Sequence, residues 1–172
     1  EVLRTPHLGF SSRTVGEGFA DDFLIKADKN PNTRGAKLLG ISEEKFDDIV
    51  RYVTEGKIRA LLVFGNGIAD LSDAETGRLL ANVPFVVQIA TNEGAVSRAA
   101  HAILPSASFV ERGGTFTNHA GRVQRFWMGF PPRGKARSAI EIITGLANRL
   151  GADWKFAGEG SVTVLRWPQT AT

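Results

Sequence analysis

The sequence predicts an α/β domain with a Rossmann-like, mostly parallel sheet and flanking helices. Three apolar runs, at 58–64, 83–90 and 102–104, are rich in β-branched residues and alternate with two segments of helical character. Short apolar runs of this kind are typical of parallel strands covered on both faces. Their alternation with helices is the pattern of βαβ units. Because the first residue is Glu, not Met, we expect a fragment of a larger subunit.

Three regions follow from this pattern. Residues 1–41 lack sustained periodicity and are expected to form an irregular lead-in from a preceding domain. Residues 42–151 hold the strand and helix signals and form the Rossmann-like domain. Residues 152–172 form a C-terminal tail, in which 161–165 alternates enough to be an edge strand.

Capping residues predict the helix boundaries. Serine, threonine or asparagine at the N-cap accepts a hydrogen bond from the first turn, and a glutamate three residues later can return one. A glycine after the last turn permits the left-handed backbone that ends a helix. These signals predict helices over 42–55, 73–81, 92–100 and 139–150, capped by Ser42, Ser72, Thr91 or Asn92, and Ser138.

The composition excludes several classes of function. The 172 residues are 42% hydrophobic and 23% charged, which is ordinary for a globular domain. No apolar run approaches the roughly 20 residues needed to cross a bilayer, so no direct membrane insertion is expected. The chain has no cysteine, so no thiolate can hold an iron–sulfur cluster or act as a nucleophile.

Metal and catalytic motifs are not expected either. The three histidines, His7, His101 and His119, are dispersed without metal-ligand spacing. No nucleophile elbow and no phosphate-binding Walker sequence is present. We therefore predict no metal site and no catalytic residue, and an isolated chain without activity.

A basic segment runs from Arg112 to Arg137. It holds six cationic residues and no Asp or Glu, on a chain whose net charge is +3. Such a segment can face phosphates, an acidic partner subunit or a neighbouring domain, or it can be an ordinary solvated loop. Nucleic acid is not expected, because no helix collects these cations on one face.

Three segments fall where the predicted parallel strands end. They are Gly65–Gly67, Thr91–Glu93 and Pro105–Thr117. In open parallel sheets, ligands bind at the carboxyl ends of the strands. One interpretation is a cleft for the nucleotide part of a cofactor. The other is that the glycines simply form short turns between strand and helix.

The stretch 104–126 carries a resemblance to a known family. Its pattern LP-x-x-x-x-x-E-x-x-GT-x-x-N-x-x-GR-x-Q resembles the molybdopterin oxidoreductase superfamily. That superfamily includes formate dehydrogenases, nitrate reductases and the large iron–sulfur subunit of bacterial NADH–quinone oxidoreductase, complex I. The resemblance covers roughly 58–151. The matched residues are Leu104, Pro105, Glu111, Gly114, Thr115, Asn118, Gly121, Arg122 and Gln124.

Two departures favour the complex I branch. His101 and Ala120 stand where many relatives carry a carboxylate near the pterin dinucleotide. The large iron–sulfur subunit of complex I resembles the enzymes in fold but generally carries no molybdopterin. By resemblance, the chain is a structural domain of an electron-transferring subunit that passes electrons from NADH to quinone through iron–sulfur clusters outside this fragment. The implied partners are other domains of the parent and other complex subunits, in the cytoplasm and peripheral to the inner membrane.

The alternative is a molybdopterin-dinucleotide-binding domain of a molybdenum enzyme such as a formate dehydrogenase. The cofactor-binding residues would then be Gly65, Asn66, Thr91, Asn92, Gly114, Thr115, Asn118 and Arg122. Without a cofactor, we expect Gly114, Thr115 and Asn118 to clamp the backbone of the strand-end loops, and Arg122 to pair with a carboxylate such as Glu111.

Overall fold

A three-stranded parallel sheet forms the larger part of the fold. The computed structural model describes residues 9, 23, 31–41, 44–68 and 71–156. The strands lie in the order β1, β2, β3, and Leu61 of β1 pairs with Val86 of β2. The predicted α/β class and the parallel pairing of the three apolar runs are confirmed. The strands are β1 (Ala60–Phe64), β2 (Phe85–Ala90) and β3 (Ala102–Pro105).

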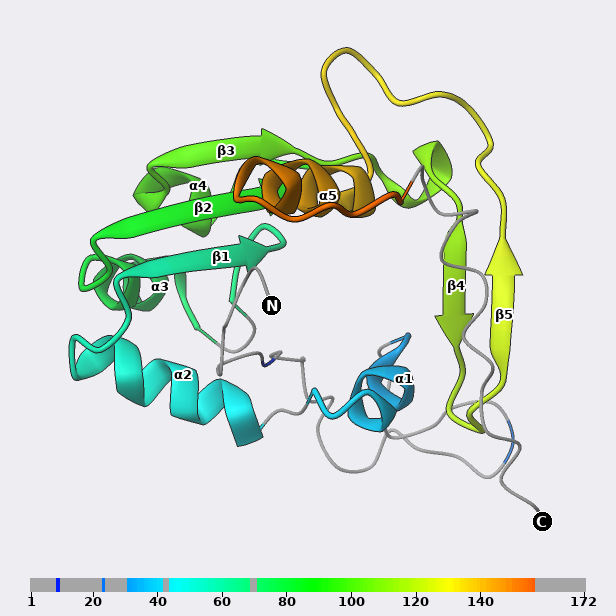
Figure 1. Ribbon diagram of the computed structural model, residues 1–172. Helices are drawn as coiled ribbons and strands as arrows, with labels where there is room; N and C mark the ends of the chain where they lie inside the picture. Colours follow the sequence, from blue (N-terminus) through cyan, green and yellow to red (C-terminus); the bar gives the residue numbers. More distant parts are fainter. Residues whose placement is uncertain (1–8, 10–22, 24–30, 42–43, 69–70, 157–172) are drawn as a thin grey trace.

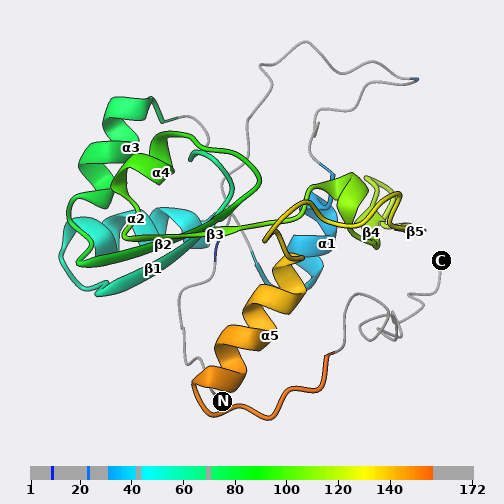
Figure 2. The same cartoon turned by 90° about the horizontal axis from the view of Figure 1, so that it is seen from above.

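Helices lie on both sides of this sheet. They are α2 (Glu44–Thr54), α3 (Asp73–Leu80), α4 (Ala95–Ala99) and α5 (Ala139–Arg149). Helices α3 and α4 pack against each other on one side of the sheet, and α5 lies on the other side (Figures 1 and 2). Helix α4 is shorter than the predicted 92–100, and the predicted cap at Thr91 or Asn92 is wrong, because the extended residue Gly94 is the N-cap.

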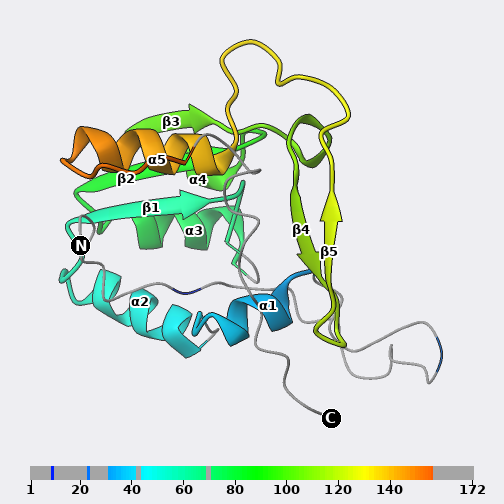
Figure 3. The same cartoon turned by 45° about the vertical axis from the view of Figure 1, so that its right-hand side comes forward.

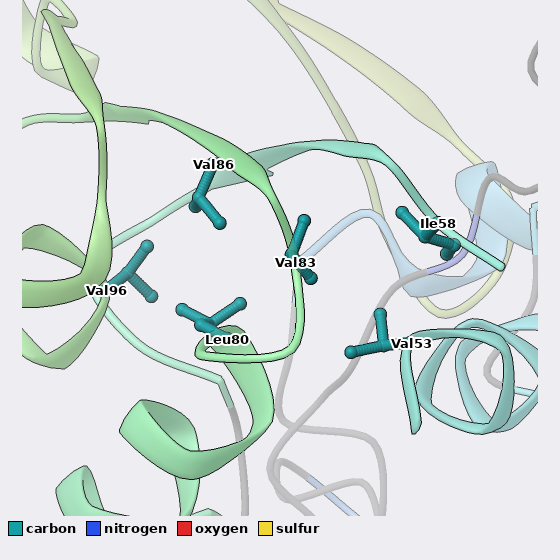
Figure 4. Packing of buried hydrophobic residues seen from close by; sticks show 6 residues of the cluster. All are labelled: Val53, Ile58, Leu80, Val83, Val86 and Val96. Atoms are coloured by element: carbon teal, nitrogen blue, oxygen red, sulfur yellow. The ribbon is translucent and has the colours of Figure 1, made fainter. Parts of the chain in front are cut away.

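The hydrophobic core lies between the sheet and the helices α2, α3 and α4. Figure 4 shows its six fully or almost fully buried side chains converging from strands, helices and their connections. Burying aliphatic side chains of this size contributes about 1.5–3 kcal/mol each. These residues are Val53, Ile58, Leu80, Val83, Val86 and Val96.

The predicted capping boxes fix two helix starts. Ser72 N–H donates to Glu75 Oε2 at 2.8 Å, and Glu75 N–H donates back to Ser72 Oγ at 3.3 Å. Ser138 and Glu141 form the same pair at 2.9 and 3.3 Å. The hydrogen bonds from Ser72 lower the pKa of the Glu75 carboxyl, so the box is formed with a charged glutamate.

An antiparallel hairpin stands beside the sheet. It consists of β4 (Gly114–Thr117) and β5 (Val123–Phe126), and a short 3₁₀ turn, η1 (Phe109–Glu111), leads into it. The hairpin lies on the side toward which the three parallel strands point (Figures 1 and 3). The loop residues that follow the parallel strands therefore face the region where the hairpin stands.

A short helix, α1 (Thr33–Leu38), packs against the hairpin. Asn32 N–H donates to Thr117 O at 3.2 Å, and Thr117 N–H donates to Asn32 Oδ1 at 2.7 Å. A Cβ on Gly35 would lie 2.8 Å from Thr117 Oγ1 and 3.1 Å from Thr117 Cβ, so a larger residue would displace the Thr117 side chain. The expected irregular lead-in over 1–41 is therefore wrong for 33–38, where contacts with the hairpin stabilise a helix. The predicted edge strand at 161–165 lies outside the described residues.

Within the described ranges, every helix is too short or too polar to span a bilayer.

Candidate functional site

Two of the three strand-end segments named from the sequence meet at the carboxyl edge of the sheet. Gly65 follows β1 with φ +117°, a value that favours glycine, and its N–H donates to Ile89 O at 3.0 Å. Asn92 follows β2, and its backbone N–H donates to Asn66 Oδ1 at 3.4 Å. The side chains of Asn66, Thr91 and Asn92 are exposed. They offer amide and hydroxyl groups to a ligand at this edge.

Gly94 lets the two loops approach closely. A Cβ at this position would lie 2.2 Å from the carbonyl oxygen of Asn66. The Val96 N–H points at the same oxygen, 3.5 Å away. The steric requirement for glycine at 94 comes from the neighbouring loop, since its φ of −170° is ordinary extended backbone.

Arg137 reaches the same edge from a distant part of the sequence. Ser106, just after β3, forms a parallel β-bridge with Arg137. Arg137 N–H donates to Pro105 O at 3.2 Å, and Ala107 N–H donates to Arg137 O at 2.8 Å. The sequence pattern placed Arg137 only in the basic segment. It did not place this exposed cation beside the end of β3, because no local pattern encodes the return of the chain.

The other predicted site residues lie on the hairpin. Gly114 and Thr115 are in β4, and Asn118 lies in the turn, where its Oδ1 accepts hydrogen bonds from Ala120 N–H at 3.0 Å and Arg122 N–H at 2.9 Å. Asn118 thus stabilises its own turn and not the strand-end loops, so that part of the expected clamp is wrong. Among the described residues, no hydrogen bond joins these hairpin positions to the loops of Gly65 and Asn92.

Glu111 does not pair with Arg122 as expected. Its carboxylate accepts hydrogen bonds from Ser108 N–H at 3.0 Å and Ser108 Oγ at 2.9 Å. Its other oxygen accepts from Arg133 N–H at 3.2 Å. These bonds, chiefly those from Ser108, lower the pKa of Glu111. The Ser108 bonds hold the carboxylate within η1, and the Arg133 bond joins η1 to the loop after the hairpin.

The two departures from the family pattern lie away from the strand-end loops. His101 precedes β3, at the opposite end of the sheet from its carboxyl edge, and its Nδ1 accepts a hydrogen bond from Val86 N–H at 3.1 Å. Ala120 lies at the tip of the hairpin, where Arg34 Nη1 donates to the carbonyl oxygen of His119 at 2.9 Å. Neither replacement removes a carboxylate from the loops at Gly65 and Asn92.

The carboxyl edge fits the nucleotide part of a cofactor better than a metal. Asn66, Thr91 and Asn92 present uncharged donors and acceptors beside the exposed carboxylate of Glu93. Arg137, whose backbone is bridged to Ser106, brings a cation of the kind that suits a phosphate. Within the described residues, no group of three His, Asp or Glu side chains is placed to hold a metal ion. With no cysteine in the chain, no thiolate is available as a metal ligand here.

A parallel sheet with polar loops at its carboxyl edge is the arrangement in which open α/β domains bind their ligands. The chain belongs to the molybdopterin oxidoreductase family, whose model matches residues 7–149. The match extends well upstream of residue 58, where the resemblance carried by the sequence motifs begins.

Named relatives agree with this family. The chain is 30% identical over 139 residues to "Putative formate dehydrogenase SAB2186c" of Staphylococcus aureus (strain bovine RF122 / ET3-1), covering 80% of this chain and 14% of that protein. It is 33% identical over 107 residues to "Putative formate dehydrogenase YrhE" of Bacillus subtilis (strain 168), covering 61% of this chain and 11% of that protein. The chain therefore spans about one seventh or less of these relatives.

Proposed function

We propose that this chain holds the nucleotide part of a molybdopterin dinucleotide in an oxidoreductase of the formate dehydrogenase kind. The observation that carries the proposal is the meeting of two polar loops, at Gly65–Gly67 and Thr91–Gly94, at the carboxyl edge of the parallel sheet. The family match and the relatives' names support the same assignment. A bound molybdopterin would supply the oxidation–reduction chemistry, with its metal ligated from outside this chain.

The chain's own residues would bind and orient the cofactor. Asn66 and Asn92 are placed to hydrogen-bond a base or ribose, because an amide both donates and accepts. Arg137, at the end of β3, is placed to neutralise a phosphate. On the hairpin, the exposed side chains of Thr115 and Arg122 are free to contact the cofactor from the facing side.

Nucleotide titration tests this proposal. Guanosine diphosphate and cytidine diphosphate, added to the ¹⁵N-labelled 172-residue chain, should shift the amide resonances of 65–67 and 91–94. Asn92→Ala should weaken that binding several-fold. The matched control is Asn82→Ala, which changes an exposed amide that caps the end of α3 far from these loops. Resonances of both loops that stay unmoved at millimolar nucleotide would rule the proposal out.

The second candidate is the large iron–sulfur subunit of NADH–quinone oxidoreductase, with the chain acting as a scaffold beside iron–sulfur domains. In that case the parent would lie in the cytoplasm, peripheral to the inner membrane. The observation that supports a scaffold is an exposed surface at the end of the hairpin, formed by Arg125, Trp127 and Phe130. Trp127 and Phe130 are 71% and 60% exposed, and the Arg125 guanidinium lies 3.7 Å from the centroid of the Trp127 ring. Exposed aromatic and arginine side chains are typical of protein interfaces.

We propose that this surface contacts other domains or subunits of the parent protein. No cation of the basic segment 112–137 forms an ion pair with a described residue. A partner surface with carboxylates would therefore complement it. The parent's sequence upstream of residue 1 separates the two candidates. A cysteine, selenocysteine or serine metal ligand there supports the molybdenum enzyme, and cluster motifs without such a ligand support the complex I subunit.

A further inference from the structure

Gln88 is a buried amide in an otherwise apolar strand. It lies in the middle of β2, and its side chain is fully buried. Its Nε2 donates to the carbonyl oxygen of Gly65 at 2.9 Å, and its Oε1 accepts from Ser97 Oγ at 2.7 Å. A buried amide without partners is costly, so these two bonds determine how the side chain lies.

Ser97 continues this connection to the second loop. Its hydroxyl oxygen accepts a hydrogen bond from the backbone N–H of Gly94 at 2.9 Å. One chain of three hydrogen bonds therefore runs from Gly94 through Ser97 and Gln88 to Gly65. Every donor in it points the same way, and hydrogen bonds arranged head to tail polarise and strengthen one another.

The two ends of this chain belong to the two loops of the candidate site. The loops already touch, since a Cβ on Gly94 would lie 2.2 Å from Asn66 O. Two direct hydrogen bonds also join the loops, from Asn92 N–H to Asn66 Oδ1 at 3.4 Å and from Val96 N–H to Asn66 O at 3.5 Å, and both are long. The chain through Gln88 adds a restraint of shorter, partly buried hydrogen bonds, which must also break if the loops separate.

We propose that Gln88 is a positioning residue that couples the two loops, so that the cofactor meets a preformed pair. The ligand in this inference rests on the proposed function, whereas the coupling between the two loops rests on the three hydrogen bonds. Only an amide fits the position. A glutamate would set a second acceptor against the Gly65 carbonyl, and a methionine of similar length would neither donate to Gly65 nor hold Ser97.

Hydrogen exchange in the 172-residue chain tests the coupling at a distance. In Gln88→Met, the Gly94 N–H keeps its direct acceptor, Ser97 Oγ. Faster exchange at Gly94 must therefore be transmitted from the lost bond between Ser97 and Gln88. In Ser97→Ala, Gly65 keeps its ladder bond to Ile89 O. We expect exchange to accelerate about tenfold at Gly94 in the first variant and severalfold at Gly65 in the second. The His101 amide, bonded to Val86 O at 2.8 Å, should exchange as before in both.

Thr76→Val is the matched control. Thr76 is also fully buried on the helix side of the sheet, but among the described residues its hydroxyl has no hydrogen-bond partner. Removing that hydroxyl should leave exchange at Gly65 and Gly94 unchanged. It should also leave the dissociation constant for guanosine diphosphate unchanged, whereas Gln88→Met should raise that constant about tenfold.

The outcomes separate the coupling from the proposed function. Unchanged exchange at the remote glycine in both variants overturns the coupling. If Gln88→Met does not fold, Ser97→Ala decides by the same criterion. If the remote exchange accelerates but the unmodified chain binds no nucleotide, the proposed function fails and the coupling stands. If the unmodified chain binds nucleotide and Gln88→Met binds it equally well, the positioning role is overturned.

Discussion

The parallel sheet and the β4–β5 hairpin are held together by different forces. The sheet rests on a continuous apolar core, in which Val53, Leu80 and Val86 are almost completely inaccessible to solvent. On the hairpin, only Thr117 of the eight strand residues is buried. A two-stranded hairpin is marginally stable by itself. Here it depends on its turn, on the stacked rings of Phe116 and Phe126, and on α1.

This difference matters for the candidate site, which draws residues from both parts. Gly65, Asn66 and Asn92 follow strands of the sheet and are positioned by its core. Thr115 and Arg122 lie on a ribbon whose geometry depends on local polar contacts. We therefore expect the sheet side of the site to be the more rigid, and the following changes test that contrast.

Leu80→Ala should have the largest effect. Leu80 is 1% exposed in the core beneath the sheet, and truncation to alanine at such positions costs about 2–5 kcal/mol. Urea unfolding followed by circular dichroism measures the loss. Leu39→Ala is the control, since Leu39 is 60% exposed and should change the midpoint little. Equal losses from the two variants would contradict the assignment of the core.

Asn32→Ala should loosen the hairpin without loosening the sheet. It removes the acceptor of the Thr117 N–H, and it places alanine at φ +70°, where asparagine is tolerated better. We expect a local loss of roughly 1–3 kcal/mol, seen as faster amide exchange at Thr117. Asn32→Gly keeps the backbone angle and should lose less. Equally accelerated exchange at Val86, in the sheet, would contradict independent stabilisation of the two parts.

Asn118→Ala should have a smaller effect, again confined to the hairpin. It deletes the side-chain oxygen that accepts from Ala120 and Arg122, at a half-exposed position. The expected loss is about 1 kcal/mol in urea unfolding. Asn118→Asp retains the acceptor oxygens and should remain close to the unmodified chain. A fully neutral Asn118→Ala would show that the turn forms without this side chain.

Glu111 should give the smallest effect, and one that depends on pH. Because its pKa is lowered in the folded chain, its stabilisation is present above the ordinary glutamate pKa and is lost as pH falls through the lowered value. Glu111→Gln lacks this contribution. The stability difference between the two proteins, measured by urea unfolding from about pH 6 to about pH 3, should shrink on acidification. A difference independent of pH would show that the carboxylate charge plays no part.

Local signals in the sequence predicted the three parallel strands and the starts of α3 and α5, but not the cap of α4. The capping boxes at Ser72 and Ser138 act within one helical turn, so four residues encode each of them. Gly56 and Gly151 have φ of +68° and +98°, as expected after a helix. Helix α1 was not predicted, because its six residues contain a glycine and no glutamate that could complete a capping box. Its determinant is Thr117, which lies 85 residues away in sequence.

The candidate site was predictable in part for the same reason. That parallel strands end together is a rule of topology, so Gly65, Asn66 and Asn92 could be grouped from their places in the sequence alone. The hydrogen-bond partners of Glu111 and Asn118 could not be predicted, because each side chain has several donors within reach and only the fold selects among them. Gln88 did leave a signal, as the single polar residue in an apolar strand, but its two partners come from other elements.

The bridge between Ser106 and Arg137 gives the chain a modular topology. The segment 107–136, with η1, the hairpin and the loop after it, leaves the sheet and returns to the same place, since Ala107 N–H bonds to Arg137 O. Its ends are therefore adjacent, as in an inserted element. A short linker across this base could replace the whole segment while the three strands and α5 keep their connections. The same junction would accept a different recognition element grafted onto an unchanged sheet.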